Sequence, residues 1–175
     1  MNRLRLAGVI KESIVDGPGL RYVVFAQGCP HRCKGCHNER TWAFDGGFET
    51  EPSTIVADMK LNPLLDGVTL SGGEPFRQSG GMAELARLAR EAGYNVFTYT
   101  GYIYEELLNL SLTDRSVRAL LDYSDTLIDG PFISEYKSYD IAFRGSSNQR
   151  AIRLSELSDD KHGKNTRRGN TGTGS

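Results

Sequence analysis

Segments of strand-like and helix-like composition alternate along this chain, and the alternation restricts the folds that it can adopt. Strands are predicted by short runs rich in Val, Ile, Phe, Tyr and Thr that end at Gly or a polar turn: residues 22–26, 67–70, 94–99 and 126–128, and more weakly 151–154. Apolar spacing predicts a helix over residues 81–92, and Ser53 and Asp114 are expected to cap two more. Alternating strands and helices with short connections are typical of an α/β fold with a mostly parallel sheet.

The length of the chain limits how far such a sheet can close. Its 175 residues correspond to about one domain. Residues 159–175 contain no aliphatic or aromatic residue, Met or Cys, so burial cannot offset the entropy of ordering them, and we expect a disordered polar tail. The remaining domain, residues 1–158, is too short for a complete eight-stranded barrel, which rarely has fewer than about 200 residues. A partial barrel or an open sheet is therefore expected.

Charge and composition exclude several classes of function. The chain has 21 Lys and Arg against 22 Asp and Glu, so no overall field favours nucleic acid or a membrane surface. No apolar run approaches the roughly 20 residues that cross a bilayer, and the first residues lack the apolar core of a secretion signal. We therefore expect a cytoplasmic protein. The chain has no Gly-x-x-x-x-Gly-Lys loop, so hydrolysis of a nucleoside triphosphate is not supported.

Glycine-rich or polar clusters follow four of the expected strands. These clusters are residues 27–29, 71–75, 100–101 and 129–131. Because the carboxyl ends of parallel strands lie on one edge of a sheet, and ligands bind at that edge, the four clusters are expected to meet in space.

All three cysteines of the chain, Cys29, Cys33 and Cys36, fall within eight residues. An odd count and a reducing compartment argue against disulfides. The loop is polar and also carries His31 and His37, which argues against three inert core thiols. Metal binding accounts best for the cluster.

Two kinds of metal site compete for this loop. Zinc would take the three thiolates with His31 or His37 as a fourth ligand. A [4Fe–4S] cluster normally takes four thiolates, so three would leave one iron open to a small molecule with an amino and a carboxylate group. The loop by itself leaves both alternatives open.

The Cys-x-x-x-Cys-x-x-Cys spacing directly follows a strand, and Gly72-Gly73-Glu74-Pro75 follows the next clear strand. This combination resembles the radical S-adenosylmethionine (SAM) superfamily, which implies a partial βα barrel, a [4Fe–4S] cluster on the three cysteines, and SAM as a second cofactor. The resemblance implies that Glu74 or nearby backbone accepts from the ammonium group of SAM. Two glycines let backbone approach a ligand, and a carboxylate complements a cation. Without the cysteines, the same residues would be interpreted as a turn.

The resemblance extends over most of the expected domain. Residues 15–21, 25–42, 70–75, 100–102 with Glu105, 127–132 and 144–150 resemble, in order and spacing, the activating proteins of anaerobic ribonucleotide reductases. This implies an oxidoreductase that cleaves SAM reductively and uses the 5′-deoxyadenosyl radical to form a glycyl radical on the large reductase subunit, its protein substrate. It further implies a low-potential electron donor such as a flavodoxin, and it is compatible with a homodimer.

The same resemblance implies specific contacts with SAM. The backbone of Gly35, Cys36 and His37 is expected along the nucleoside part, and Gly72 near the methionyl part. Gly35 stands where the wider superfamily often has an aromatic residue, a departure that fits the reductase-activating branch.

Several features of the sequence can be interpreted in a second way. The protein could activate another glycyl-radical enzyme of the formate-lyase type, or be an interaction module stabilised by zinc on three Cys and one His. Residues 144–150 are either a surface loop or a contact with the partner subunit, and residues 16–19 are either a tight turn or a loop bordering SAM or the incoming glycine.

Overall fold

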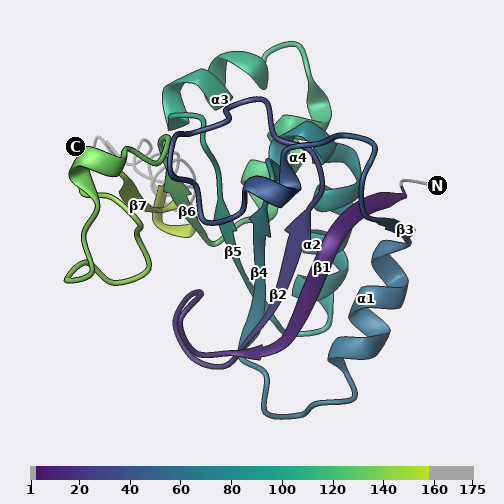
Figure 1. Ribbon diagram of the computed structural model, residues 1–175. Helices are drawn as coiled ribbons and strands as arrows, with labels where there is room; N and C mark the ends of the chain where they lie inside the picture. The colour runs from purple at the N-terminus through teal and green to yellow at the C-terminus, as the bar shows by residue number, and fades with distance from the viewer. Residues whose placement is uncertain (1–2, 158–175) are drawn as a thin grey trace, which may run out of the picture.

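The computed structural model describes residues 3–157 (Figure 1); the expected polar tail, residues 159–175, lies outside the described residues. The strands are β1 (Leu4–Ser13), β2 (Arg21–Ala26), β3 (Phe48–Thr50), β4 (Gly67–Gly72), β5 (Asn95–Tyr99), β6 (Thr126–Asp129) and β7 (Arg150–Arg153). The helices are α1 (Pro52–Met59), α2 (Ser79–Glu91), α3 (Tyr104–Leu110) and α4 (Arg115–Tyr123), with short 3-10 turns η1 (Glu39–Thr41), η2 (Pro75–Gln78) and η3 (Ser134–Tyr136).

The strands form one mixed sheet in the order β3-β1-β2-β4-β5-β6-β7. The four central strands β2, β4, β5 and β6 are parallel to one another. The pairs at both sides are antiparallel: β1 with β2 and with β3, and β6 with β7. The prediction of an α/β fold with a mostly parallel sheet is therefore confirmed, with the parallel pairs at the centre and the antiparallel pairs at the two sides.

The five strands expected from the sequence are all present, as β2, β4, β5, β6 and β7. β1 and β3 were not predicted from the sequence. β1 buries Leu4 and Leu6 but is exposed from Ile10 to Glu12, so it lacks a compact apolar run. β3 has only three residues, and its pairing with β1 is what defines it.

The helix predictions are mostly confirmed. The expected helix over 81–92 is α2, and the side chain of Asp114 accepts from Ser116 N at 2.8 Å at the start of α4. The prediction that Ser53 caps a helix is wrong: α1 begins at Pro52, whose fixed φ suits the first helical position. The short helix α3 was not predicted. Within residues 3–157, no helix is both long and apolar enough to span a bilayer.

The helices cover one face of the sheet, where the apolar core lies (Figure 1). Along each central strand, alternate side chains enter this core: Tyr22, Val24 and Ala26 from β2, Val68 and Leu70 from β4, Val96 from β5, and Leu127 from β6. α2 packs against both α1 and α4. Because side chains of a strand alternate between faces, the intervening residues of these strands point to the opposite face.

The opposite face carries a buried cation, Arg21, at the start of β2. Its guanidinium donates to Thr69 Oγ1 at 3.1 Å and to Val68 O at 2.6 Å, and it also bonds to the side chain of Asn95. The group lies 5.9 Å from the ring centroid of Phe97. Burial lowers the pKa of Arg21 to about 10, so it stays charged at neutral pH. One side chain thus joins β2, β4 and β5 where these parallel strands begin.

Replacing Arg21 should destabilise the fold strongly. Arg21→Met leaves the buried Val68 O and Asn95 side chain without their donor, and we expect a loss of about 3 kcal/mol in the free energy of unfolding. Arg21→Lys keeps the charge without the planar fork and should lose less. Urea denaturation followed by circular dichroism measures both. Arg87→Met, on the surface of α2, is the control and should barely move the midpoint; an equal loss there would contradict the assignment.

Candidate metal centre and active site

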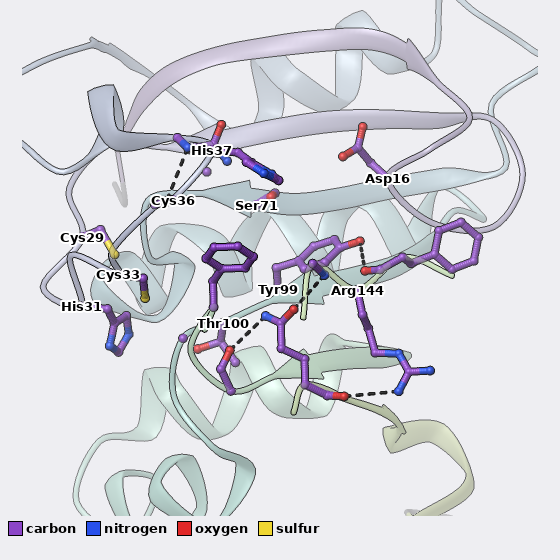
Figure 2. A pocket seen from close by; sticks show the side chains of 18 of the residues that line it. Asp16, Cys29, His31, Cys33, Cys36, His37, Ser71, Tyr99, Thr100 and Arg144 are labelled. Carbon is purple, nitrogen blue, oxygen red and sulfur yellow. Dashed lines mark hydrogen bonds between the residues drawn. The ribbon is translucent and has the colours of Figure 1, made fainter. Parts of the chain in front are cut away.

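A cavity of about 680 Å³ lies where the four parallel strands end. All four clusters expected at this edge contribute to it, through Cys29, Gly72 and Gly73, Thr100 and Gly101, and Gly130. Ser71 and Tyr99 line it from the face of the sheet opposite the helices. Figure 2 shows Cys29, Cys33 and His31 at one end of the cavity and Asp16 and Arg144 toward the other. The expectation that these clusters meet is therefore confirmed.

The cysteine loop, defined here as residues 27–42, leaves the end of β2 and brings all three thiols to the cavity. Its base is closed by two backbone bonds, from Gly28 N to Thr41 O at 2.7 Å and from Cys29 N to Trp42 O at 3.2 Å. Cys29 is buried and Cys33 and Cys36 are half-buried, and none is in a disulfide.

Gly35 has a backbone conformation that explains its identity. Its φ is +75°, in the left-handed region where side chains with a Cβ are strained. Gly35 lies inside the turn that is closed by a bond from Cys36 N to Cys33 O at 3.1 Å. The aromatic residue common in the wider superfamily would therefore be disfavoured in this particular loop.

Burial sets the protonation of two of the thiols. It raises the pKa of Cys29, and neighbouring backbone N–H groups of His31 and Arg32 oppose the shift only in part. It raises the pKa of Cys33 in the same way. In the metal-free protein both groups are therefore protonated at neutral pH, and a bound metal must displace their protons.

Gly72 and Gly73 allow two loops to lie against each other. A Cβ on Gly73 would lie 2.4 Å from Gly28 O, and one on Gly72 would lie 2.5 Å from Phe25 Cα. Gly73 N donates to Ala26 O at 2.8 Å. Both glycines also line the cavity, and the close approach to a ligand that is expected of them stays a prediction.

Glu74 does not line the cavity in this structure and is fully buried. Its carboxylate accepts from Gly101 N at 2.8 Å, Phe76 N at 3.0 Å and Thr100 Oγ1 at 3.0 Å. The remaining partner is His31 Nε2, at 2.8 Å from Oε2. The contact with SAM expected of Glu74 stays a prediction, and its contacts within the protein were not foreseen.

The two histidines that the zinc alternative needs are engaged otherwise. His31 pairs with Glu74, and the ring of His37 packs against Phe132 with centroids 5.5 Å apart. Among residues 3–157, no three side chains of His, Cys, Asp or Glu meet at a point that suits a single metal ion.

A strap, defined as residues 130–149, forms the wall facing the sheet, and it is held mainly by polar contacts. Tyr99 Oη donates to Phe143 O at 2.6 Å, tying the strap to β5. The buried Gln149 accepts from Gly145 N at 2.9 Å and donates to Gly130 O at 3.0 Å. Much of the segment 144–150 therefore builds the cavity wall, a role that sequence analysis did not consider.

Arg150 fixes the far end of this wall. Its guanidinium donates to the buried Asp129 at the end of β6 and to Glu105 in α3 at 2.8 Å. This pairing lowers the pKa of Glu105 to about 2. Asp129 also accepts from Tyr104 N at 2.8 Å, where α3 begins. Three motifs separated in sequence thus form one network.

Trp42 lines the cavity. Its indole Nε1 is buried and has no hydrogen-bond partner within the described residues. Because buried donors are nearly always paired, this group is a candidate donor to a bound ligand.

Comparison with known proteins assigns the chain to a family. The family described as a 4Fe-4S single cluster domain matches residues 15–152. The anaerobic ribonucleoside-triphosphate reductase-activating protein of Vibrio cholerae is 37% identical over 144 residues, which cover 78% of this chain and 89% of that protein. The proteins of the same name from Escherichia coli K12 and Enterobacteria phage T4 are each 32% identical, over 78% of this chain and 90% and 85% of theirs.

Among solved structures, QueE from Escherichia coli aligns with a TM-score of 0.47 and 17% identity, over 57% of this chain and 52% of that one. A likeness of this size adds nothing to the assignment, which rests on the sequence relatives. With its three cysteines on one loop at the cavity, this chain belongs to the family of anaerobic ribonucleoside-triphosphate reductase-activating proteins.

Proposed function

We propose that this protein is a radical SAM activase. It cleaves SAM reductively and uses the resulting 5′-deoxyadenosyl radical to form a glycyl radical on an anaerobic ribonucleoside-triphosphate reductase. One observation carries the proposal: three free thiols on one loop border a ligand-sized cavity, in a chain whose relatives bear the name of that activity.

The donor set suits an iron–sulfur cluster. Cys29, Cys33 and Cys36 would hold it, since all three thiols are free and line the same cavity. A [4Fe–4S] cluster held there supplies one electron for the cleavage of SAM and an iron open to its amino and carboxylate groups. Cys29 is the thiol best shielded from water, whereas Cys33 and Cys36 are half-buried.

We place SAM across the cavity, between the cysteine loop and the strand ends. The backbone of Gly35, Cys36 and His37 would lie along the nucleoside, and Gly72 and Gly73 beside the methionyl group. The volume of about 680 Å³ is in the range of small-molecule sites. Trp42 would donate its unpaired Nε1–H to the ligand, which accounts for its otherwise unsatisfied burial.

The protein substrate enters from the side that the sheet leaves open. Val15 and Tyr139 line the cavity although they are 72% and 85% exposed, so apolar groups border its mouth. We infer that the sheet acts as an incomplete barrel whose missing wall is supplied by the reductase. Its glycine can then reach the cavity without passing through the core. Glycine suits the reaction because it has no side chain to block access to its α-carbon.

The electron donor is inferred to be a low-potential protein such as a flavodoxin, and a homodimer stays a prediction. We place the reaction in the cytoplasm, where thiols stay reduced. Arg32 and Lys34 on the cysteine loop give that end of the molecule a positive charge, which would attract an acidic donor.

Removing one thiol should abolish cluster binding. Cys33→Ala leaves only two thiolates, so after anaerobic reconstitution we expect iron content to fall by about tenfold or more. Iron and sulfide analysis with absorption spectroscopy measures this. Unchanged iron content in the variant would show that the cluster does not use this loop. Zinc in the parent protein in place of iron would favour the interaction module instead.

Filling the cavity should separate SAM binding from cluster binding. Ser71→Leu adds bulk on the sheet side of the cavity, at a residue that supplies no thiol, and we expect SAM affinity to fall about tenfold to a hundredfold with iron content unchanged. Isothermal titration of the reconstituted protein gives the affinity. Ser71→Ala, which adds no bulk, is the matched control. Equal SAM affinity in the Leu variant and the parent would mean that SAM binds elsewhere.

The reductase should be the activated partner. Reduced protein, SAM and the large anaerobic reductase subunit should together give a glycyl radical signal in electron paramagnetic resonance, and omission of SAM should remove it. Formate lyase, mixed in the same way, serves as the alternative partner. A radical on formate lyase and none on the reductase would overturn the choice of substrate.

A further inference from the structure

The side chain of His31 attaches the half of the cysteine loop between Cys29 and Cys33 to the sheet edge. Its Nε2 lies 2.8 Å from Glu74 Oε2, and its side chain is only 18% exposed. Figure 2 shows His31 beside Cys29 and Cys33 at the same end of the cavity. The contact joins residues 43 positions apart, so it fixes the loop relative to the end of β4.

The carboxylate of Glu74, with which His31 pairs, is itself held in place by several hydrogen bonds. Thr100 Oγ1 lies 3.0 and 3.1 Å from its two oxygens, and Gly101 N and Phe76 N also donate to it. Glu74 is 0% exposed, so these donors replace water completely. A carboxylate with this many hydrogen-bond donors stays in its position, and a further donor would have to displace one of those already bonded to it.

The residues after β5 are shaped around the His31 ring. A Cβ on Gly101 would lie 2.4 Å from His31 Cδ2, so only glycine leaves room for the ring at its present place. Tyr102 packs edge-on against the ring, with centroids 4.5 Å apart and an interplanar angle of 78°. Thr100 and Gly101 donate hydrogen bonds to the carboxylate of Glu74. Gly101 also leaves space for the His31 ring, and Tyr102 packs against that ring. This convergence on one histidine is the observation that carries the inference.

We propose that Glu74 is a positioning residue: through His31 it holds the first half of the cysteine loop against the ends of β4 and β5, so that the thiols face the cavity before iron arrives. The consequence for the cluster rests on the proposed function, whereas the anchoring of the loop does not. The ammonium group of SAM is then left to the backbone beside Gly72 and Gly73. Glu74 is needed for the cluster more than for SAM.

The anchoring can be tested in the metal-free protein. Cys29 is buried, so its alkylation by iodoacetamide, measured residue by residue by mass spectrometry, reports release of the loop. We expect Glu74→Gln, His31→Ala and Gly101→Ala each to increase the rate about tenfold at fixed pH. The double variant Glu74→Gln/His31→Ala should match the single ones, because both remove the same contact. His31→Gln, which keeps a donor of similar reach, should restore most of the protection.

The control is Glu49→Gln, which removes a carboxylate from an exposed pair with Arg3 and Arg5 and should leave Cys29 protected. Circular dichroism melts show whether each variant is folded. Should Glu74→Gln unfold, His31→Ala and Gly101→Ala decide the matter, since neither removes the buried carboxylate. Unchanged protection of Cys29 in folded His31→Ala would overturn the anchoring.

Reconstituted protein separates this role from a contact with SAM. We expect iron affinity to fall about 10- to 100-fold in Glu74→Gln and in His31→Ala, as for other groups that orient metal ligands, while SAM affinity of the cluster-loaded fraction changes little. The opposite pattern, with iron retained in both variants and SAM affinity lost only in Glu74→Gln, would assign Glu74 to SAM. A parent protein that takes up no cluster would contradict the proposed function, and the alkylation result would still decide the anchoring.

Discussion

Parallel pairing of β2, β4, β5 and β6 gives four strand ends a common edge, and each part of the site starts from one of those ends. The cysteine loop follows β2, the glycine pair and Glu74 follow β4, Thr100 and Gly101 follow β5, and the strap follows β6. Because the register is fixed by backbone bonds, these segments are neighbours whatever their side chains are. The side chains then need only short contacts to complete a cavity.

The sequence predicted those strands and helix ends that depend on residues close together along the chain. Runs of β-branched and aromatic residues marked the central strands, and the side chain of Asp114 marked the start of α4. β1 was not predicted because its order comes from pairing with β2 and β3. α3 was not predicted because its N-cap residue, Ile103, has no side chain that can cap a helix. The three cysteines could be proposed as metal ligands from the sequence, since all three lie on one loop.

The parts of the site that depend on distant contacts could not be predicted. The sequence predicted that Glu74 lies in a loop at the edge of the sheet, but not that it pairs with His31. No local signal indicated that Tyr99 would donate a hydrogen bond to Phe143 in the strap. Arg21 is a similar case, because a charged residue at the start of a strand is expected at the surface. Such residues are recognised only once the sheet has brought their partners together.

Because the cysteine loop is separate from the apolar core, damage by oxygen at the loop would not reach the packing of the core. The core is formed by the helices and one face of the sheet, and none of the three cysteines belongs to it. Oxidative loss of an iron–sulfur cluster would therefore leave the hydrophobic packing in place. The fold that places the three thiols at the cavity would then outlast the cluster that they hold.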